Sequence, residues 1–524
     1  MLKWKPSCNY PQFIYPPNPW FSLSSFQRLI SNVSWSVLGK FCTQILLFAV
    51  SIIITRHLGK ESLGVYAALL VIPNFVYLLN SMGVETLVNK KLPELNVIDA
   101  SGRSGRHLLQ RLLTFRLLTA SILCASLYFI FPYYIEFINK QELFQYRTAI
   151  LVYFLVLTIN SFLSTLLMAQ LRYKAVSITE TVSAGLNLLL LVLFVTMDYG
   201  VVGVLYAYVF ATAVNILIYA CLSRGYFIGE TEKPGWNEMK PLALTAYGMS
   251  LFSFGLMTQS DVLLMNFFQV SDADVGYYHL ATSVAAMLAF ILTGIGPLAL
   301  SMFSETHARE SVAGLSRLWC QIIGLAAFLT TPIYVFAFFN AEKLLTFVFG
   351  ATYAGAATVF ALFVFFSCAQ TVLGWHFTTS TLFILHRRKT VLSSTIEGSV
   401  INILLNLILI PAYGMAGAVF ATGLVMVYMV LRQLYVIQKE VHIGPAFPVI
   451  GKCVLFSLGA AMMTKGTEWF VVDHVLFNAA VYLAAFAVLL VWIKPFTQEH
   501  HRLMSEIHPS LDKIAKWVTR GEAL

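Results

Sequence analysis

Long apolar stretches recur along almost the whole chain, and they limit its fold more than any other feature. An α-helix rises about 1.5 Å per residue, so about twenty apolar residues cross the roughly 30 Å hydrocarbon core of a bilayer. Stretches of this length lie at residues 34–55, 63–83, 112–134, 147–169, 176–196, 200–222, 242–268, 275–298, 317–339, 355–380, 391–410, 414–437, 447–463 and 475–493. The sequence therefore predicts an all-α, polytopic membrane protein with about fourteen transmembrane helices.

The composition agrees with a chain that lies in lipid. Of its 524 residues, 58% are hydrophobic and 11% are charged, which is too apolar for a soluble chain of this length. The net charge of +9 does not indicate nucleic-acid binding, because the basic residues lie in short clusters between apolar stretches and form no stripe with aromatic residues. The seven cysteines include no CxxC pair, so the sequence predicts no metal site, no disulfide framework and no cofactor.

The Lys and Arg residues are concentrated on one side of the predicted helices. They gather in the N-terminal tail (1–33), in the loop between the second and third stretches, in every second loop after it, and in the C-terminal tail (494–524). Cytoplasmic loops of membrane proteins keep an excess of Lys and Arg. We therefore expect both ends of the chain to lie in the cytoplasm, which requires an even number of transmembrane helices.

Short motifs recur about 213 residues apart. The matching pairs are 199–203 (YGVVG) with 413–417 (YGMAG), 171–174 (LRYK) with 385–388 (LHRR), and 64–66 (GVY) with 276–278 (GYY). Apolar helices resemble one another by composition, but composition explains the glycine spacing and the basic turns less well than a repeat does. The sequence therefore predicts an internal repeat.

The repeat predicts two six-helix lobes, at 34–222 and 242–437, that are joined by a cytoplasmic connector at 223–241. An accessory helix pair at 447–493 lies outside the repeat. Because each copy has an even number of helices, both enter the membrane in the same orientation and are related by an axis along the membrane normal. Two lobes around a central cleft are typical of secondary transporters that work by alternating access.

The segment 31–95 resembles the opening of the polysaccharide biosynthesis (O-antigen and exopolysaccharide) flippase family. The residues that carry the likeness are Arg56, Leu58, Gly59, Gly64, Tyr66 and Gly83. It continues through 260–261, 275–281 and 413–417, and so covers about residues 30 to 440. The resemblance implies a member of the multidrug/oligosaccharidyl-lipid/polysaccharide exporter superfamily. Its expected function is to move an undecaprenyl-diphosphate-linked oligosaccharide across the bacterial inner membrane, alongside glycosyltransferases and a polysaccharide polymerase.

Two other transport functions stay open within the same superfamily. One is a cation-coupled drug or metabolite antiporter, and the other is a flippase for a peptidoglycan lipid precursor. An enzyme, such as a polysaccharide polymerase or a ligase, is not expected. The predicted outer loops of this chain are all short, and the sequence contains no His/Asp pair or paired carboxylates that would indicate acid/base chemistry.

Charged residues inside transmembrane helices are costly and are therefore candidates for function. Lys40, Arg116 and Arg432 could bind the anionic diphosphate of a cargo lipid in a central cleft. Lys40 could instead pack between helices or snorkel, and snorkelling to the cytoplasmic interface is the alternative for Arg116 and Arg432. Glu85 and Glu180 lie at the ends of stretches, where we expect water to solvate them.

Three further residues could bind the H⁺ or Na⁺ that would drive transport. Asp261 lies in an apolar stretch beside Gln259, Ser260 and Asn266, and Glu397 shares a helix face with Asn402 and Asn406. Interhelical hydrogen bonds or ion pairs are the alternative role for Asp261, Glu397 and Asn266. We interpret the dipeptide 375–376 (WH) as part of an aromatic belt at the cytoplasmic interface.

Overall fold

A computed structural model of the chain describes residues 25–99, 101–233, 239–289, 295–467 and 474–493. Every element in these residues is a helix, which confirms the predicted all-α class. The first half forms α1 (Ser25–Ser81), α2 (Val84–Ile98), α3 (Arg103–Phe137), η2 (Gln141–Tyr146), α4 (Arg147–Ala169), α5 (Tyr173–Thr196), α6 (Gly200–Ser223) and η3 (Arg224–Tyr226). The second half forms α7 (Met239–Phe254), α8 (Thr258–Phe267), α9 (Asp272–Leu288), α11 (Ile295–Phe339), α12 (Ala341–Phe349), η4 (Ala351–Ala356), α13 (Ala357–Val372), α14 (Trp375–Ile384), α15 (Arg388–Ile437), α16 (Ala446–Thr467) and α17 (Val475–Ile493).

Nine helices of the described chain are long and apolar enough to cross a membrane. Among the helices much longer than a bilayer is thick, two are interrupted by a glycine. α15 has 50 residues, and α1 has 57, and each is interrupted by a glycine with positive φ, Gly414 (φ 56°) or Gly59 (φ 74°). Each of these helices therefore holds two of the predicted apolar stretches. The total of about fourteen crossings stays a prediction, and the stretch at 275–298 lies partly outside the described residues.

Two stretches that we expected to be continuous helices are broken, so this expectation was wrong. The stretch 242–268 becomes α7 and α8, with a break at 255–257, and the stretch 355–380 becomes α13 and α14. The second break has a local cause, because Gly374 adopts the left-handed conformation (φ 83°) that strains residues with a side chain. At the first break, the Asn402 side chain donates a 2.7 Å hydrogen bond to the Gly255 carbonyl oxygen, which satisfies an acceptor that the helix no longer uses.

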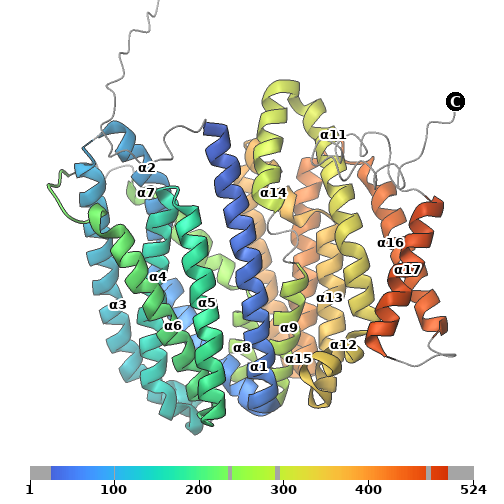
Figure 1. Cartoon of the computed structure of the whole chain (residues 1–524), viewed down its shortest axis with the longest axis horizontal. Coiled ribbons are helices and arrows are strands. Elements are labelled where there is room, and N and C mark those ends of the chain that lie inside the picture. The colour runs from blue at the N-terminus through green and yellow to red at the C-terminus, as the bar shows by residue number, and fades with distance from the viewer. Residues whose placement is uncertain (1–24, 100, 234–238, 290–294, 468–473, 494–524) are drawn as a thin grey trace, which may run out of the picture.

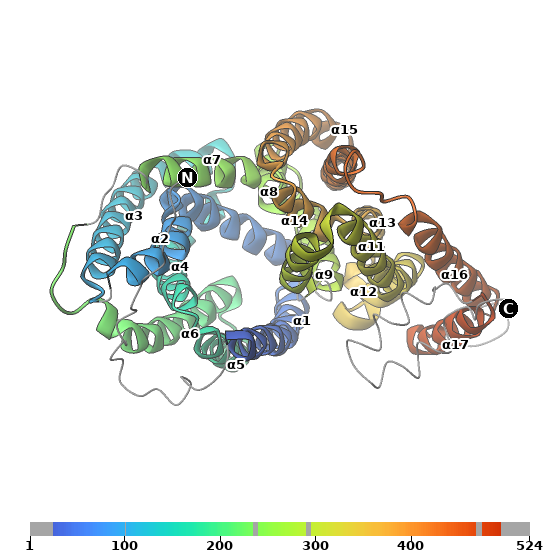
Figure 2. The same cartoon turned by 90° about the horizontal axis from the view of Figure 1, so that it is seen from above.

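The helices form two groups (Figures 1 and 2). α1 to α6 lie on one side, α8 to α15 lie on the other, and α16 and α17 lie at the far end beside the second group. Similar backbone features recur in both groups. A residue with φ 57° precedes α5 (Leu171) and α15 (His386), and η2 and η4 directly precede α4 and α13. The boundaries of the two six-helix lobes stay a prediction.

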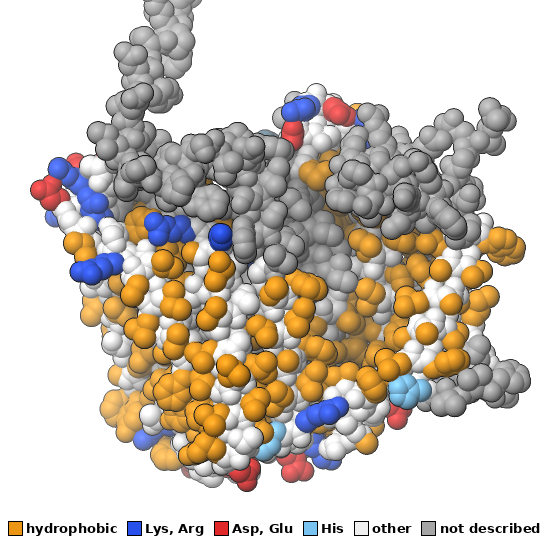
Figure 3. Space-filling model, in the orientation of Figure 1, with side chains coloured by type: hydrophobic (Ala, Val, Ile, Leu, Met, Phe, Trp, Pro, Cys, Tyr) orange, Lys and Arg blue, Asp and Glu red, His pale blue; other side chains and the backbone are white. Residues whose placement is uncertain are grey.

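The surface has the pattern of a protein surrounded by lipid. Hydrophobic side chains cover a broad band around the middle, and the visible charged side chains lie mainly at its upper and lower rims (Figure 3). Large apolar side chains in this band are strongly exposed, such as Phe129 and Leu189 at 70% each. Water would make such exposure unfavourable, whereas hydrocarbon does not. The chain is therefore a multi-pass membrane protein.

Candidate functional site

A cavity of about 450 Å³ lies between the two groups of helices. Its wall contains one segment of α1, the break between α7 and α8, and parts of α8, α9, α11, α13, α14 and α15. The polar side chains in this wall belong to Asn74, Thr258, Gln259, His279, Thr282, Ser283, Tyr334, Ser367, Gln370, Thr371, Trp375 and His376. Among the described residues, this lining contains no Asp, Glu, Lys or Arg. The cavity therefore offers hydrogen bonds and aromatic surface to a ligand, with little fixed charge.

Both helix breaks lie at this cavity. Residues 256–259, around the first break, and 370–371 and 375–376, around the second, are part of its wall. Our interpretation of Trp375 and His376 as an interfacial belt was therefore wrong, because the break at Gly374 places them at the start of α14 and beside the cavity. A sequence signal existed in principle, since glycine is the residue that most readily interrupts a helix in this way.

Asp261 is fully buried in α8 and accepts hydrogen bonds from four neutral donors. The donors are Tyr278 Oη at 2.5 Å, Asn406 Nδ2 at 2.7 Å, Thr422 Oγ1 at 2.7 Å and Asn402 Nδ2 at 3.4 Å. No Lys or Arg of the described chain forms an ion pair with this carboxylate. A carboxyl group inside a membrane protein without a cationic partner is either protonated or close to a bound cation.

The Asp261 network lies next to the central cavity. A smaller cavity of about 220 Å³ has Asn402 and Thr422 in its wall, and it shares Leu256, Gln370, Trp375 and Met426 with the central cavity. Asn402 also accepts a hydrogen bond from Thr422 Oγ1 at 3.2 Å, which joins two ligands of Asp261 to each other. A change at Asp261 can therefore reach the cavity wall through single hydrogen bonds.

The other predicted residues of this set lie elsewhere. Asn266, near the end of α8, accepts a 2.6 Å hydrogen bond from Lys140 Nζ, and Lys140 also pairs with Asp272. Asn266 is therefore not a neighbour of Asp261 in the network. We expected Asn402 and Asn406 beside Glu397, but they bind Asp261, which the sequence could not show because the partner comes from another helix.

Glu397 forms a contact with a residue that we had expected to bind cargo. Its Oε2 accepts a 2.8 Å hydrogen bond from Tyr428 and lies 3.4 Å from Arg432 Nε. The Glu397 and Arg432 side chains are 37% and 34% exposed. The two candidates therefore belong to one ion pair within α15, on helical arms that Gly414 separates.

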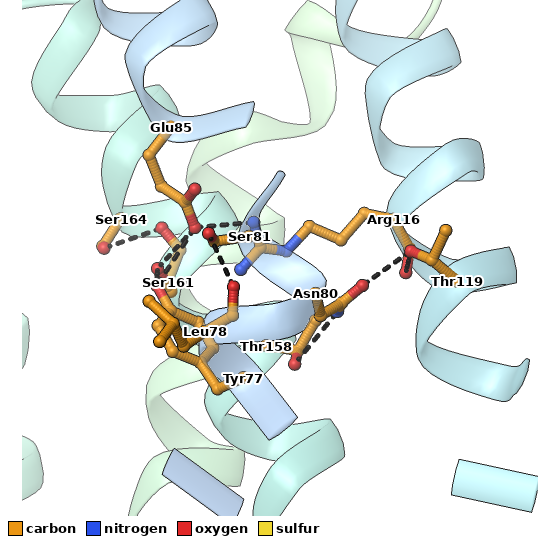
Figure 4. Close-up of polar contacts among 10 residues, drawn as sticks. All are labelled: Tyr77, Leu78, Asn80, Ser81, Glu85, Arg116, Thr119, Thr158, Ser161 and Ser164. Carbon is orange, nitrogen blue, oxygen red and sulfur yellow. Dashed lines mark hydrogen bonds and ion pairs between the residues drawn. The ribbon is translucent and has the colours of Figure 1, made fainter. Parts of the chain in front are cut away.

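Arg116 is 1% exposed and belongs to a polar cluster inside the first group (Figure 4). Its Nη1 lies 2.6 Å from Glu85 Oε1, and the same oxygen accepts hydrogen bonds from Tyr77 (3.0 Å) and Ser161 (3.3 Å). Snorkelling of Arg116 and full solvation of Glu85 were therefore wrong expectations. The physical reason is that each charge finds its counter-ion on a neighbouring helix, so neither has to reach water.

Lys40 has an exposed side chain on α1, close enough to Glu180 of α5 for the two charges to interact. Glu180 lines a separate cavity of about 140 Å³ in the first group, together with Asn160 and Asn215. None of Lys40, Arg116 and Arg432 lines the central cavity. Their role in cargo binding stays a prediction.

Comparison with known proteins adds the family. A model of the family described as polysaccharide biosynthesis protein matches residues 53–358. An uncharacterized membrane protein of Methanocaldococcus jannaschii is 22% identical over 450 residues, which cover 80% of this chain and 85% of that protein.

Solved structures share the fold at low sequence identity. The chain is similar to the lipid II flippase MurJ in an inward closed conformation, with a TM-score of 0.71, 15% identity, and coverage of 87% of this chain and 97% of that one. It is also similar to an inward-facing multidrug resistance MATE family transporter of the MOP superfamily, with a TM-score of 0.64, 15% identity, and coverage of 76% and 94%. The predicted resemblance is confirmed, since the family match spans more than half of the chain. The chain therefore belongs to the polysaccharide biosynthesis protein family and has the fold of membrane flippases and transporters, not of an enzyme.

Proposed function

We propose that this protein is a flippase for an oligosaccharide linked to undecaprenyl diphosphate, working in the biosynthesis of a surface polysaccharide. The observation that carries the proposal is the chemistry of the central cavity, whose polar lining in the described part of the chain consists of amides, hydroxyls, imidazoles and an indole without any carboxylate. Such groups suit hydroxyl-rich sugars and an anionic headgroup. An exporter of cationic drugs would instead benefit from a carboxylate in the cavity wall, so the antiporter alternative has less support.

The contacts between the two groups of helices support alternating access. At the lower end in Figure 1, Arg56 donates hydrogen bonds to the carbonyl oxygens of Phe347 (3.2 Å) and Val348 (2.9 Å) in α12. Tyr353 donates a 2.5 Å hydrogen bond to the Thr55 carbonyl oxygen in the same region. In the proposed cycle, these bonds hold the lower end closed and break when the two lobes rock apart there.

The proposed location is the bacterial inner membrane, with both ends of the chain in the cytoplasm. Glycosyltransferases would complete the cargo on the cytoplasmic leaflet, and a polymerase would use it on the other side. A peptidoglycan lipid precursor has the same diphosphate and a comparable polar head, so it is the second candidate cargo.

A transport assay with purified protein tests the proposed function. Proteoliposomes that contain a short-chain, fluorescent, diphosphate-linked oligosaccharide should move it between leaflets faster than empty liposomes or liposomes with the same sugar on a neutral lipid. The readout is the fraction of sugar accessible to a glycosidase added outside. Equal rates with and without the protein would contradict the flippase function.

We further propose that Asp261 binds the H⁺ or Na⁺ whose gradient drives the cargo. Asp261→Asn keeps the shape of the side chain and removes its ability to exchange a proton or to bind Na⁺ as an anion. We expect transport by this variant to lose its dependence on an imposed pH or Na⁺ gradient, with a residual gradient-independent rate. A gradient dependence equal to that of the wild-type protein would exclude Asp261 as the coupling site.

A further inference from the structure

Two half-helices begin at the central cavity. α8 starts at Thr258 after the break at 255–257, and α14 starts at Trp375 after Gly374, and each has ten residues. Thr258 and Gln259 of α8, and Trp375 and His376 of α14, all line the cavity. Figure 1 shows α14 in the upper half of the molecule and α8 in the lower half, and both begin at the cavity between them. The N-terminal ends of both half-helices therefore converge on one space.

The backbone N–H groups at these ends have no acceptor in the described chain. α8 and α14 lack a side-chain cap, and no carbonyl group accepts a hydrogen bond from the N–H of residues 258, 259, 375 or 376. The first N–H groups of any helix point out along its axis and carry a partial positive charge. Helix N-termini therefore bind anions, and half-helices at the middle of a transporter do so in the absence of a basic side chain.

A buried hydroxyl group marks the same space independently. Tyr334 of α11 is 1% exposed and lines the cavity, and its Oη lies beside Thr371 but forms no hydrogen bond of normal geometry within the described residues. A buried hydroxyl group without a partner costs stability, so an unpartnered one beside a cavity indicates a position for a polar ligand atom.

We infer that the N-termini of α8 and α14, together with the Tyr334 hydroxyl group, bind the diphosphate of the cargo lipid. This inference rests on the proposed function for the identity of the cargo. It assigns the headgroup to backbone donors, and not to Lys40, Arg116 or Arg432, none of which reaches the cavity wall. The remaining space beside Gln370 and Trp375 is left for the first sugar.

The position of Asp261 connects this site to the driving ion. Asp261 lies in the first turn of α8, where an uncompensated negative charge opposes an anion at the same helix end. Its four donors come from α9 and α15, so the carboxylate lies to the side of the cavity. A cation at Asp261 removes the opposing charge, and binding of the cation and of the diphosphate therefore favour each other.

Calorimetric titration of the full-length protein in nanodiscs with inorganic pyrophosphate tests the site. Gln259→Glu and His376→Asp each place a negative charge in the first turn of a half-helix, and we expect each to weaken pyrophosphate binding roughly tenfold. His376→Asn is the uncharged control for His376→Asp, and it should stay within about twofold of the wild type. Pyrophosphate that binds Gln259→Glu and His376→Asp as tightly as the wild type, or that does not bind the wild type at all, overturns the inference.

A proline substitution tests the backbone donors directly. Thr258 is the first residue of α8, a position that accepts proline, and the preceding Met257 (φ −91°, ψ 149°) has the extended conformation that proline requires before it. Thr258→Pro removes one N–H group, and we expect about threefold weaker binding than in the control Thr258→Ala. Equal affinities of these two variants count against the α8 end of the site.

Farnesyl diphosphate distinguishes a lipid headgroup from a free anion. If farnesyl diphosphate binds more tightly than pyrophosphate, the result supports a lipid-linked cargo. If farnesyl diphosphate binds equally or more weakly, the result overturns the assignment of the site to a lipid-linked diphosphate. The transport assay separates the two proposals. If the wild-type protein transports the cargo but the added charges do not weaken pyrophosphate binding, only the proposed site is refuted. If the added charges weaken pyrophosphate binding but the wild-type protein does not transport the cargo, only the flippase function is refuted.

Discussion

Arg116 and Glu85 form an ion pair inside the first group of helices, and their unequal burial has a measurable consequence. The Arg116 side chain is 1% exposed and the Glu85 side chain is 23% exposed. Glu85→Gln leaves a guanidinium group without an anion, and we expect a loss of about 3 to 5 kcal/mol of stability. Arg116→Met should cost less, because water can reach the carboxylate that remains, and the double variant should regain most of the loss.

Thermal unfolding of Glu85→Gln, Arg116→Met and the double variant in detergent gives the order of their stabilities. The pair Arg309 and Glu305 is a matched control, because its side chains are 75% and 60% exposed, and Glu305→Gln should change the melting temperature little. A double variant that is less stable than Glu85→Gln would show that Glu85 and Arg116 do not stabilise the protein through each other.

The candidate residues could be predicted better than their partners. Asp261, Glu397 and Arg116 were found from the sequence because a charge inside an apolar stretch is rare. Asn402 and Asn406 donate hydrogen bonds to Asp261 because α15 packs against α8. Helical periodicity along one segment carries no information about that contact. The unpartnered Tyr334 hydroxyl group is a property of the packed structure and has no sequence signal.

At the scale of the elements, α1 and α9 approach each other through a pair of glycines that the repeat relates. A Cβ atom on Gly64 would lie 1.8 Å from the Asp272 carbonyl oxygen, and one on Gly276 would lie 2.1 Å from the Lys60 carbonyl oxygen. Each glycine thus faces the residue that precedes the other glycine by four positions. The sequence showed these glycines as equivalent, but it did not show that they touch.

Alanine at either glycine should weaken closure of the lower end. Gly64→Ala or Gly276→Ala forces the two helix backbones apart, so we expect a cysteine at Ser283, which lines a cavity beside His279, to react faster with a thiol reagent. Gly451→Ala is the control, since a Cβ there meets no atom within 4 Å. Unchanged reactivity in both variants, measured in a cysteine-free background, would show that the glycine contact does not control access.

Helix breaks were the features of the elements that the sequence concealed. The chain contains 31 glycines, and the sequence does not distinguish Gly374, which ends one helix, from a glycine such as Gly451 inside α16. Hydropathy stays high across both breaks, because the residues around a cavity in the middle of the membrane are still largely apolar. A continuous apolar stretch therefore predicts the crossing but not its continuity.

At the scale of the whole molecule, the distribution of Lys and Arg predicts the orientation in the membrane. Single cysteines at Ser101 and Asp198, both exposed, should react from opposite sides. A membrane-impermeant thiol reagent added to intact cells should label Asp198→Cys and leave Ser101→Cys unlabelled until the membrane is permeabilised. The reverse pattern would show that the basic loops lie outside the cell.

Arg56 reaches α12 only through main-chain oxygens, and this restricts how the two halves depend on each other's sequence. The carbonyl groups of Phe347 and Val348 remain acceptors whatever side chains those positions carry, and the C-terminal end of α12 attracts a cation for the same reason. The contact therefore requires one particular side chain, Arg56, and no particular side chain in α12. Each half can accumulate substitutions at its lower end as long as the arginine and the path of the opposite backbone are kept.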